Sequence, residues 1–392
     1  MKSIQRKQYT AVLDALQDKN LIKVVTGIRR CGKSTLLEMQ REKLKKQGFH
    51  TLYYNFEDAD TINDWNVLYK KIINGCKPDE MNYIFLDEVQ MITDFERLVD
   101  SLFVQKNTDV YITGSNAFLL SSGLATLLSG RYFELNILPF SYSEYKECLP
   151  NATLNDYLHT GGMPGAVDLL STGENFALKY LNDVYNSVVL QDVITRNNIS
   201  NPQELFSVAR FAFDTVGSPL SPNSISKSLK NENKKVDSRL VFRLIEAMKD
   251  AFVLYESKRF DIKGKEQLRT ISKFYLIDLG FRRMLIGKPK YTDIGHLLEN
   301  VVYFELLRRG NTVWTGKYGE TEIDFVVQNQ NGITEYYQVA HTAKEESTLH
   351  RELRPFEKMK DNYRKILLTT DEMEFNHNGI EQLNIEKWLL EE

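Results

Sequence analysis

The chain has 392 residues, more than one ordinary core accommodates, so two or three domains are expected. Hydrophobic residues make up 42% of it and charged residues 26%, as in soluble globular proteins. The formal net charge of −3 excludes a globally basic chain. Any nucleic-acid binding must therefore rest on local patches.

Neither a signal peptide nor a membrane-spanning segment is expected from the sequence. The first seven residues lack the apolar core of a signal peptide, and no apolar run is long enough to span a bilayer. The cysteines, Cys31, Cys76 and Cys148, have no metal-ligand spacing and fit free thiols in a reducing compartment. A cytoplasmic protein without a membrane partner is expected.

The first 150 residues alternate between strand-like and helix-like patterns. Helical spacing is found at Ser3–Gln17, Ser34–Lys46 and Asp94–Phe103. Apolar runs that predict strands are Leu21–Val25, Thr51–Phe56, Tyr83–Leu86 and Val110–Ile112. This alternation predicts an α/β domain with a parallel sheet covered on both faces. Ligands of such sheets bind at the carboxyl ends of the strands.

A phosphate-binding loop is predicted at Gly27–Ser34, which has the form G-x-x-x-x-G-K-S between a strand and a helix. Gly27 and Gly32 let the backbone wrap around phosphate oxygens, and the helix N-terminus adds positive potential. Lys33 is expected to reach the β- and γ-phosphates, and the Ser34 hydroxyl to bind Mg²⁺. Two neighbours, Arg30 and Thr35, are further candidate nucleotide contacts.

Two other strand ends carry polar residues suited to hydrolysis. The run Tyr83–Leu86 closes in Asp87, a candidate Mg²⁺ ligand, and Glu88, a candidate general base for the attacking water. The next strand ends in Thr113-Gly114-Ser115-Asn116, where Asn116 or Ser115 could sense the γ-phosphate. An ordinary turn or helix cap is the alternative for that segment.

These motifs resemble those of AAA+-type ATPases of the ASCE group. More narrowly, the chain is similar to bacterial and archaeal proteins that join an AAA_14 module to a DUF4143-type region. The matching phrases are Gly27–Ser34, Leu86-Asp87-Glu88-Val89-Gln90, Thr113-Gly114-Ser115-Asn116, Ser129-Gly130-Arg131, Leu138-Pro139-Phe140-Ser141 and Gly161-Gly162-Met163-Pro164.

The resemblance implies ATP and Mg²⁺ as ligands and a homo-oligomer. It also implies that Arg131 contacts the γ-phosphate held by a neighbouring subunit. The alternative for Arg131 is a surface arginine that is solvated or paired to a carboxylate. By the same resemblance, residues 1–149 form the ATPase domain and residues 150–200, which read as helical, form its lid.

Residues 201–276 have the layout of a winged helix. Helices are predicted at Gln203–Val216, Ser224–Leu229 and Val236–Ala251, and strands at Phe252–Glu256 and Leu268–Leu276, joined by the charged stretch Ser257–Gln267. Basic residues that could meet a DNA backbone gather here: Lys227, Lys230, Lys234, Lys235, Arg239 and Arg243. The alternative is a charged face that binds a protein partner.

Residues 277–392 resemble the core of PD-(D/E)XK nucleases. A helix at Leu297–Arg309 carries Glu299, a strand at 321–327 carries Asp324, and a strand at 336–340 follows. The third position departs from the motif, because Gln338 and Ala340 stand where an acid and a lysine are usual. A vestigial nuclease is favoured; a working one would need a lysine from elsewhere, such as Lys317 or Lys344.

The sequence as a whole predicts an ATP-hydrolysing enzyme that acts on DNA. Two alternatives stay open: an ATP-controlled switch in a protein complex, and an ATP-dependent nuclease.

Overall fold

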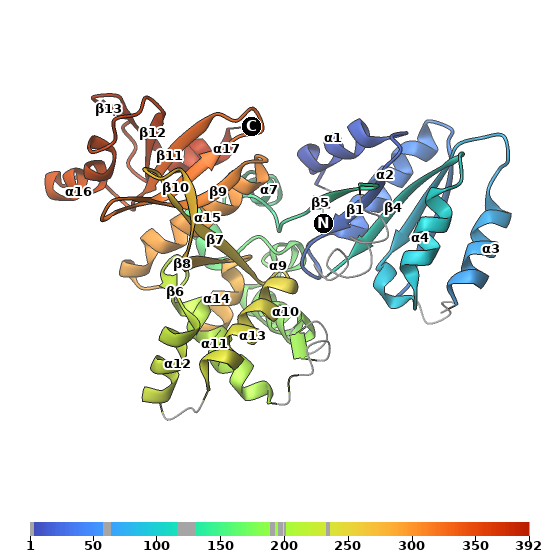
Figure 1. Cartoon of the computed structure of the whole chain (residues 1–392), viewed down its shortest axis with the longest axis horizontal. Coiled ribbons are helices and arrows are strands. Elements are labelled where there is room, and N and C mark those ends of the chain that lie inside the picture. The colour runs from blue at the N-terminus through green and yellow to red at the C-terminus, as the bar shows by residue number, and fades with distance from the viewer. Residues whose placement is uncertain are drawn as a thin grey trace. The chain divides into compact units, whose positions relative to one another are not determined.

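The computed structural model describes residues 4–57, 64–115, 130–188, 193–194, 199, 201–232 and 236–391. The chain forms two compact units (Figure 1). Unit 1 comprises Met1–Pro139 with Asp250–Phe252, and unit 2 comprises Phe140–Lys249 with Val253–Glu392.

Unit 1 is built on a five-stranded sheet in the order β2-β3-β4-β1-β5, and every neighbouring pair of strands is parallel. Its strands are β1 (Ile22–Thr26), β2 (His50–Asn55), β3 (Asn82–Asp87), β4 (Thr108–Gly114) and β5 (Tyr132–Asn136). Its helices are α1 (Lys7–Leu16), α2 (Lys33–Lys46), α3 (Trp65–Gly75) and α4 (Phe95–Phe103), with a 3₁₀ turn η1 (Val89–Met91). The predicted parallel α/β sheet is confirmed.

Strand β5 escaped the sequence-based prediction. Its residues lie at the sheet edge, beside β1, and all five are exposed or half-exposed. An edge strand needs no continuous apolar run, so hydrophobic patterning gives little signal for it.

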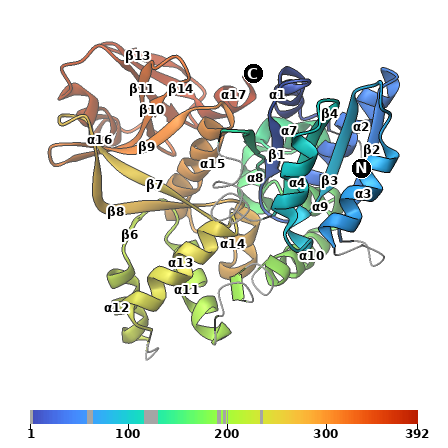
Figure 2. The same ribbon diagram turned by 45° about the vertical axis from the view of Figure 1, so that its right-hand side comes forward.

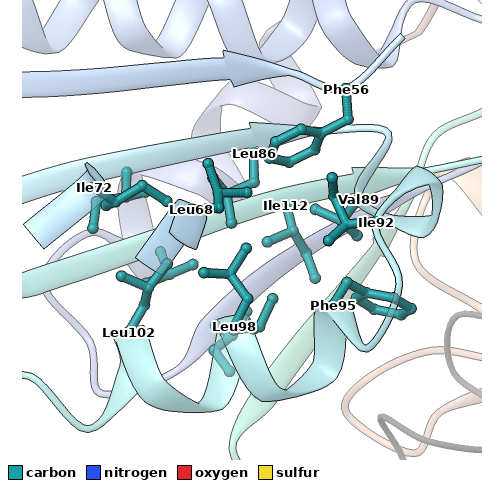
Figure 3. Packing of buried hydrophobic residues seen from close by; sticks show 14 of the residues in the cluster. Phe56, Leu68, Ile72, Leu86, Val89, Ile92, Phe95, Leu98, Leu102 and Ile112 are labelled. Atoms are coloured by element: carbon teal, nitrogen blue, oxygen red, sulfur yellow. The ribbon is translucent and has the colours of Figure 1, made fainter. Parts of the chain in front are cut away.

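The core of unit 1 lies between the sheet and the helices α3 and α4. Figure 3 shows Leu68, Ile72, Leu98 and Leu102 from these helices facing strand residues such as Ile112. Each large aliphatic side chain buried in this way stabilises the fold by about 1.5–3 kcal/mol. This packing holds the carboxyl ends of β1, β3 and β4 in fixed positions.

Unit 2 begins with short helices and continues into a region of mixed elements. The first helices are α7 (Tyr142–Cys148), α8 (Leu154–Thr160), α9 (Pro164–Leu169) and α10 (Glu174–Ser187). They are followed by α11 (Pro202–Asp214), β6 (Pro219–Leu220), α12 (Pro222–Asn231), α13 (Ser238–Asp250), β7 (Leu254–Asp261) and β8 (Glu266–Leu276). Three helices, with the short β6 between the first two, precede two long strands, and the charged stretch Ser257–Gln267 is mostly strand rather than the predicted connection. The winged helix stays a prediction.

The rest of unit 2 has two helices, three strands, a helix, three further strands and a last helix. Its elements are α14 (Leu279–Ile286), η3 (Tyr291–Asp293), α15 (Ile294–Arg308), β9 (Thr312–Tyr318), β10 (Thr321–Gln328), β11 (Thr334–Val339), α16 (Glu346–Glu357), β12 (Arg364–Thr369), β13 (Phe375–His377), β14 (Ile380–Asn384) and α17 (Ile385–Leu390).

The strands in the described part of unit 2 join in one nine-stranded mixed sheet, in the order β13-β14-β12-β11-β10-β9-β7-β8-β6 (Figure 2). The link between its two parts is a parallel pairing of β7 with β9. A boundary at residue 276 therefore cuts through a continuous sheet, and the division of this half into two domains stays a prediction.

In the Gly161–Pro164 segment, Gly161 lies against a buried carboxylate and Gly162 against the backbone of Phe140. Asp278 accepts hydrogen bonds from Gly162 N at 2.6 Å and Gly280 N at 2.8 Å. Gly161 has a φ of +71°, and a Cβ there would lie 2.1 Å from Asp278 Oδ1. Only glycine fits this contact, which ties the turn after α8 to the start of α14.

Candidate functional site

The predicted phosphate loop has the strand-loop-helix geometry that its sequence requires. Strand β1 ends at Thr26, and α2 begins at Lys33 with Gly32 as its N-cap. Gly27 has a φ of +143°, and a Cβ there would lie 2.4 Å from Ile137 O. The N-terminus of α2 therefore offers the positive end of a helix dipole to an anion bound in the loop.

A buried arginine that sequence reasoning missed braces the loop. Arg6 donates from Nη1 to Cys31 O at 3.0 Å and from Nη2 to Leu138 O at 2.7 Å. Its guanidinium thereby joins the loop to the segment that follows β5. No local motif marks this residue, because both acceptors are backbone carbonyls far away in the sequence.

Lys33 lies at the centre of the candidate site and is only 3% exposed. Its Nζ is 3.2 Å from Gly27 O, 3.3 Å from Ile28 O and 3.4 Å from Glu88 Oε1. The ammonium thus spans the phosphate loop and the end of β3, as a cation that reaches bound phosphates requires.

The next two residues of α2, Ser34 and Thr35, are exposed. They line a depression of about 1160 Å³, to which Tyr53 of β2 and Arg41 also contribute. Ser34 is therefore accessible from solvent at the start of α2. A small cation with its water shell can approach it there.

Hydrogen bonds fix the carboxylate of Asp87 at the end of β3. Thr113 of β4 donates its hydroxyl to Asp87 Oδ1, and Tyr53 donates to Oδ2 at 2.9 Å. Burial and the neighbouring carboxylate raise the pKa of Tyr53, so its hydroxyl remains a donor at neutral pH. Thr113 and Tyr53 are positioning residues whose roles the sequence did not reveal. Tyr53 lies mid-strand without a motif, and in Thr113-Gly114-Ser115-Asn116 the prediction concerned only Ser115 and Asn116.

Glu88 adopts a left-handed backbone conformation, with a φ of +53°. Its amide donates to Thr113 Oγ1 at 2.8 Å, and Ser115 Oγ donates to its carboxylate Oε2 at 2.6 Å. Gln90 also donates to this carboxylate. A non-glycine residue held in this region is strained, and such strain is concentrated at functional sites.

Opposing effects set the pKa of Glu88. Burial alone would raise it, but the ammonium of Lys33 and the hydrogen bonds from Ser115 and Gln90 bring the pKa below its ordinary value. The carboxylate is therefore ionised at neutral pH and able to accept a proton from water.

Of the segment that follows β4, the structure describes Ser115, and this residue contributes to the site. Ser115 contacts Glu88 directly, which agrees with a role beside the attacking water. Asn116, the other residue predicted to sense the γ-phosphate, lies outside the described residues.

Three arginines were considered as possible phosphate contacts: Arg29 and Arg30 in the loop, and Arg131 just before β5. Arg30 is exposed in the loop with a φ of +66°, and Arg29 pairs with Glu57 at 3.0 Å. Arg131 precedes β5 and pairs with Asp100 Oδ1 at 2.9 Å, with its side chain 48% exposed. Because β5 runs parallel to β1, Arg131 lies near the amino ends of these two strands, whereas the phosphate loop follows the carboxyl end of β1.

The basic residues predicted to meet DNA are exposed on two helices of unit 2. Lys227 and Lys230 lie on α12, and Arg239 and Arg243 on α13. Phe242, between the two arginines, is 55% exposed. Lys234 and Lys235 lie outside the described residues.

The predicted nuclease-like acids meet around a lysine that was not predicted. Glu299 and Asp324 both contact Lys273 Nζ, at 2.8 Å and 3.4 Å. Gln338 turns partly away, because its Nε2 donates to Glu352 Oε2 at 3.0 Å. The two lysines suggested by the sequence do not serve this pair: Lys317 is on β9, and Lys344 has its Nζ 4.0 Å from Asp371.

Among the described residues, no group of three or more His, Cys, Asp or Glu side chains is arranged to hold a metal ion. A Mg²⁺ ion at the phosphate loop does not need such a group. It takes one or two protein oxygens and completes its shell with water and substrate phosphates. Ser34 and Asp87 offer hard oxygen donors of this kind.

Family models match two parts of the chain. One, an AAA domain, matches residues 19–146, and the other, a domain of unknown function (DUF8612), matches residues 151–292. An uncharacterised protein of Haemophilus influenzae is 36% identical over 410 residues, covering 99% of each chain. This chain belongs to the same family. The AAA-type P-loop ATPase predicted from the motifs is confirmed for this family member, whereas the model matched after it is DUF8612 rather than DUF4143.

Other similar proteins have lower sequence identity to this chain. An uncharacterised protein of Methanocaldococcus jannaschii is 27% identical, covering 94% of this chain and 85% of its own. The solved structure of AMPPCP-bound DnaA from Aquifex aeolicus is 14% identical with a TM-score of 0.32, covering 64% of this chain and 89% of its own. That of C. elegans PCH-2 has a TM-score of 0.25 at 16% identity, covering 37% and 41%. In the described part of the chain, no helix is long and apolar enough to cross a membrane.

Proposed function

We propose that this AAA-family chain is a Mg²⁺-dependent ATPase that couples hydrolysis to the binding or remodelling of DNA. The ATPase proposal rests on one observation. Lys33 Nζ in the phosphate loop lies 3.4 Å from Glu88 Oε1, just after the end of β3. A cation for phosphate and an ionised carboxylate for water are thereby held in one place.

Different residues of the site bind the phosphates, hold Mg²⁺ and accept the proton of the attacking water. Backbone N–H groups of the loop and Lys33 bind the phosphates, with Arg30 and Thr35 as further contacts. Ser34 and Asp87 would hold Mg²⁺, which supplies neutralisation of phosphate charge. Glu88 takes a proton from the attacking water, while Ser115 and Gln90 orient its carboxylate.

Replacing the loop lysine tests the nucleotide site itself. Lys33→Ala should weaken ATP binding at least tenfold, or roughly 1.4 kcal/mol, because one charge-assisted contact to the phosphates is lost. Titration calorimetry of the full chain with ATP and Mg²⁺ measures this. Lys45→Ala, an exposed lysine on the same helix that pairs with Glu42, is the matched control and should bind normally. If Lys33→Ala binds ATP with unchanged affinity, Gly27–Ser34 is not the loop that binds the nucleotide phosphates.

The DNA part of the proposal rests on the charged face of α12 and α13. Arg239, Phe242 and Arg243 are spaced three and four residues apart, so they share one exposed face of α13. Helices that enter DNA grooves present such faces, with cations for phosphates and a flat side chain for base edges or sugars. The order of helices and strands from α11 to β8 supports a winged helix.

Charge reversal on α13 distinguishes DNA from a protein partner. Arg239→Glu/Arg243→Glu should lower affinity for duplex DNA and reduce the slope of log affinity against log salt by about 2, one for each lost phosphate contact. Binding is measured by fluorescence anisotropy over a salt series. Lys77→Glu/Arg97→Glu makes the same charge change at exposed positions of unit 1 and should bind like the unaltered chain. Equal slopes for the two variants would point to a protein partner for α13.

We further propose that the nuclease-like part of unit 2 does not cut DNA. The helix-strand order from α15 to β12 supports a PD-(D/E)XK-like fold. The loss of a lysine at Ala340 and of an acid at Gln338 argues against catalysis, since both groups stabilise the transition state in working enzymes. Lys273, which contacts Glu299 and Asp324, is no substitute for that lysine, because its ammonium is buried and already paired with three carboxylates.

A further inference from the structure

Tyr53 reaches the candidate site of unit 1 from β2, the strand at one edge of the sheet. Its hydroxyl donates to Asp87 Oδ2 at 2.9 Å, while Thr113 donates to the other oxygen, Oδ1. Asn55 is the residue of β2 that pairs with Asp87, and Tyr53, two residues earlier, lies on the same face of the sheet. Asp87 is only 1% exposed, so these two hydroxyls rather than solvent set the orientation of its carboxylate.

The ring of Tyr53 is held in turn by helix α2. The guanidinium carbon of Arg41 lies 5.0 Å from the ring centroid, which is within the range of a cation–π contact. Arg41 itself pairs with Glu38, one turn earlier on the helix, at 2.8 Å. The helix that begins at the phosphate loop therefore also fixes the side chain that orients Asp87.

Tyr53 also borders the side of the loop that a hydrated cation can reach. Ser34 and Tyr53 line the same depression beside the phosphate loop. The hydroxyl of Tyr53 thus connects the buried carboxylate of Asp87 with the solvent-accessible start of α2. An ionised carboxylate oxygen accepts more than one hydrogen bond, so the donors from Tyr53 and Thr113 leave lone pairs on Asp87 for the water molecules around a cation.

We infer that Tyr53 is a positioning residue that sets how strongly Mg²⁺ promotes nucleotide binding, because it holds the Asp87 carboxylate in one orientation. Replacing a residue that orients a metal ligand without touching the metal typically weakens metal binding about 10- to 100-fold. The inference rests on the proposed function, since it requires Ser34 and Asp87 to hold Mg²⁺ beside the ATP phosphates. It adds to the site a residue of β2, a strand that carries none of the predicted motifs.

Tyr53→Phe tests this role, because it keeps the ring and removes only the hydroxyl. The affinity of the full chain for a non-hydrolysable ATP analogue is measured by calorimetry twice, with excess Mg²⁺ and with EDTA. The ratio of the two affinities reports the contribution of the metal to binding. We expect this ratio to be about tenfold smaller in Tyr53→Phe than in the unaltered chain, with the affinity in EDTA unchanged.

Tyr83→Phe is the matched control for this substitution. Tyr83 lies near the amino end of β3, away from the phosphate loop, and its hydroxyl donates to Asp18 Oδ1 at 2.7 Å. The control thus removes the same kind of hydrogen bond from the same sheet. Both variants should unfold at a lower temperature than the unaltered chain, but Tyr83→Phe should keep its affinity ratio. A Tyr53 with a merely structural role would behave like Tyr83 in both measurements.

Three outcomes overturn the inference while leaving the proposed function intact. One is an equal affinity ratio in Tyr53→Phe and the unaltered chain. Another is a loss of affinity as large in EDTA as in Mg²⁺, because Tyr53 would then contact the nucleotide itself. The third is an equally reduced ratio in Tyr83→Phe, which would assign the effect to a general loosening of the sheet. Failure of the proposed function looks different, and the inference falls with it: the unaltered chain would bind no nucleotide, or would bind it equally well with Mg²⁺ and with EDTA.

Discussion

Glu88→Gln should bind ATP as tightly as the unaltered chain and hydrolyse it about 10²- to 10⁴-fold more slowly. The amide keeps the shape of the side chain and can still interact with Ser115, but it cannot take a proton from water. Loss of a general base alone corresponds to roughly 3–5 kcal/mol in the barrier. Turnover is measured as phosphate release under ATP saturation, with binding followed separately by calorimetry.

The matched control for this substitution is Glu80→Gln, an exposed acid paired with Lys77 in the same unit. It makes the same change in charge and should turn over normally. If Glu88→Gln and Glu80→Gln hydrolyse ATP at equal rates, Glu88 is not the base. A fall in ATP affinity of Glu88→Gln would instead assign this carboxylate to nucleotide binding through Lys33, its partner at 3.4 Å.

The residues that define the phosphate loop and the end of β3 could be predicted because their chemistry is local. A spacing such as that of Gly27, Gly32 and Lys33 is short, and a buried strand that ends in Asp87 and Glu88 is equally compact. Each is constrained by the backbone turn that it makes. These predictions therefore needed no knowledge of which strands are neighbours.

The residues that complete the site escaped prediction because their partners are distant in the sequence. Thr113 reaches Asp87 across the β3–β4 pairing, and Arg6 braces the loop through carbonyls at Cys31 and Leu138. The same limit explains the nuclease-like cluster. The sequence suggested lysines near the acids in the chain, Lys317 and Lys344, whereas the sheet brings Lys273 from β8. Only the strand order makes that residue a neighbour.

The position of Arg131 is compatible with both roles that the sequence left open for it, a contact to a neighbouring subunit and a surface ion pair. Residues Tyr132 to Asn136 pair with Ile22 to Thr26 in parallel register, so Arg131 lies near the amino end of β1. The phosphate loop follows the other end, five residues and roughly 16 Å away. An arginine at that edge cannot readily serve the nucleotide of its own subunit. Its exposed pair with Asp100, worth about 0–1 kcal/mol, is easily exchanged for a phosphate on a neighbour.

If Arg131 acts on a neighbouring subunit, Arg131→Ala should lower turnover by about 10³- to 10⁵-fold while leaving ATP affinity nearly unchanged. The decisive measurement mixes two inactive variants. A site formed by the intact Glu88 of an Arg131→Ala subunit and the intact Arg131 of a Glu88→Gln subunit contains every group required. The mixture should therefore hydrolyse ATP far faster than either variant alone, as head-to-tail contacts between copies require.

Arg97→Ala serves as the control, since this exposed arginine pairs with Asp94 on the same unit and should not affect turnover. Particle mass with ATP bound, measured in parallel, establishes whether the subunits associate under the assay conditions. If they associate and the mixture stays inactive, Arg131 is an ordinary surface ion pair and hydrolysis is completed within one subunit. If Arg131→Ala alone is fully active, the residue has no role in turnover at all, and the contact to the γ-phosphate must be sought among the arginines of the loop, of which the exposed Arg30 is the first to test.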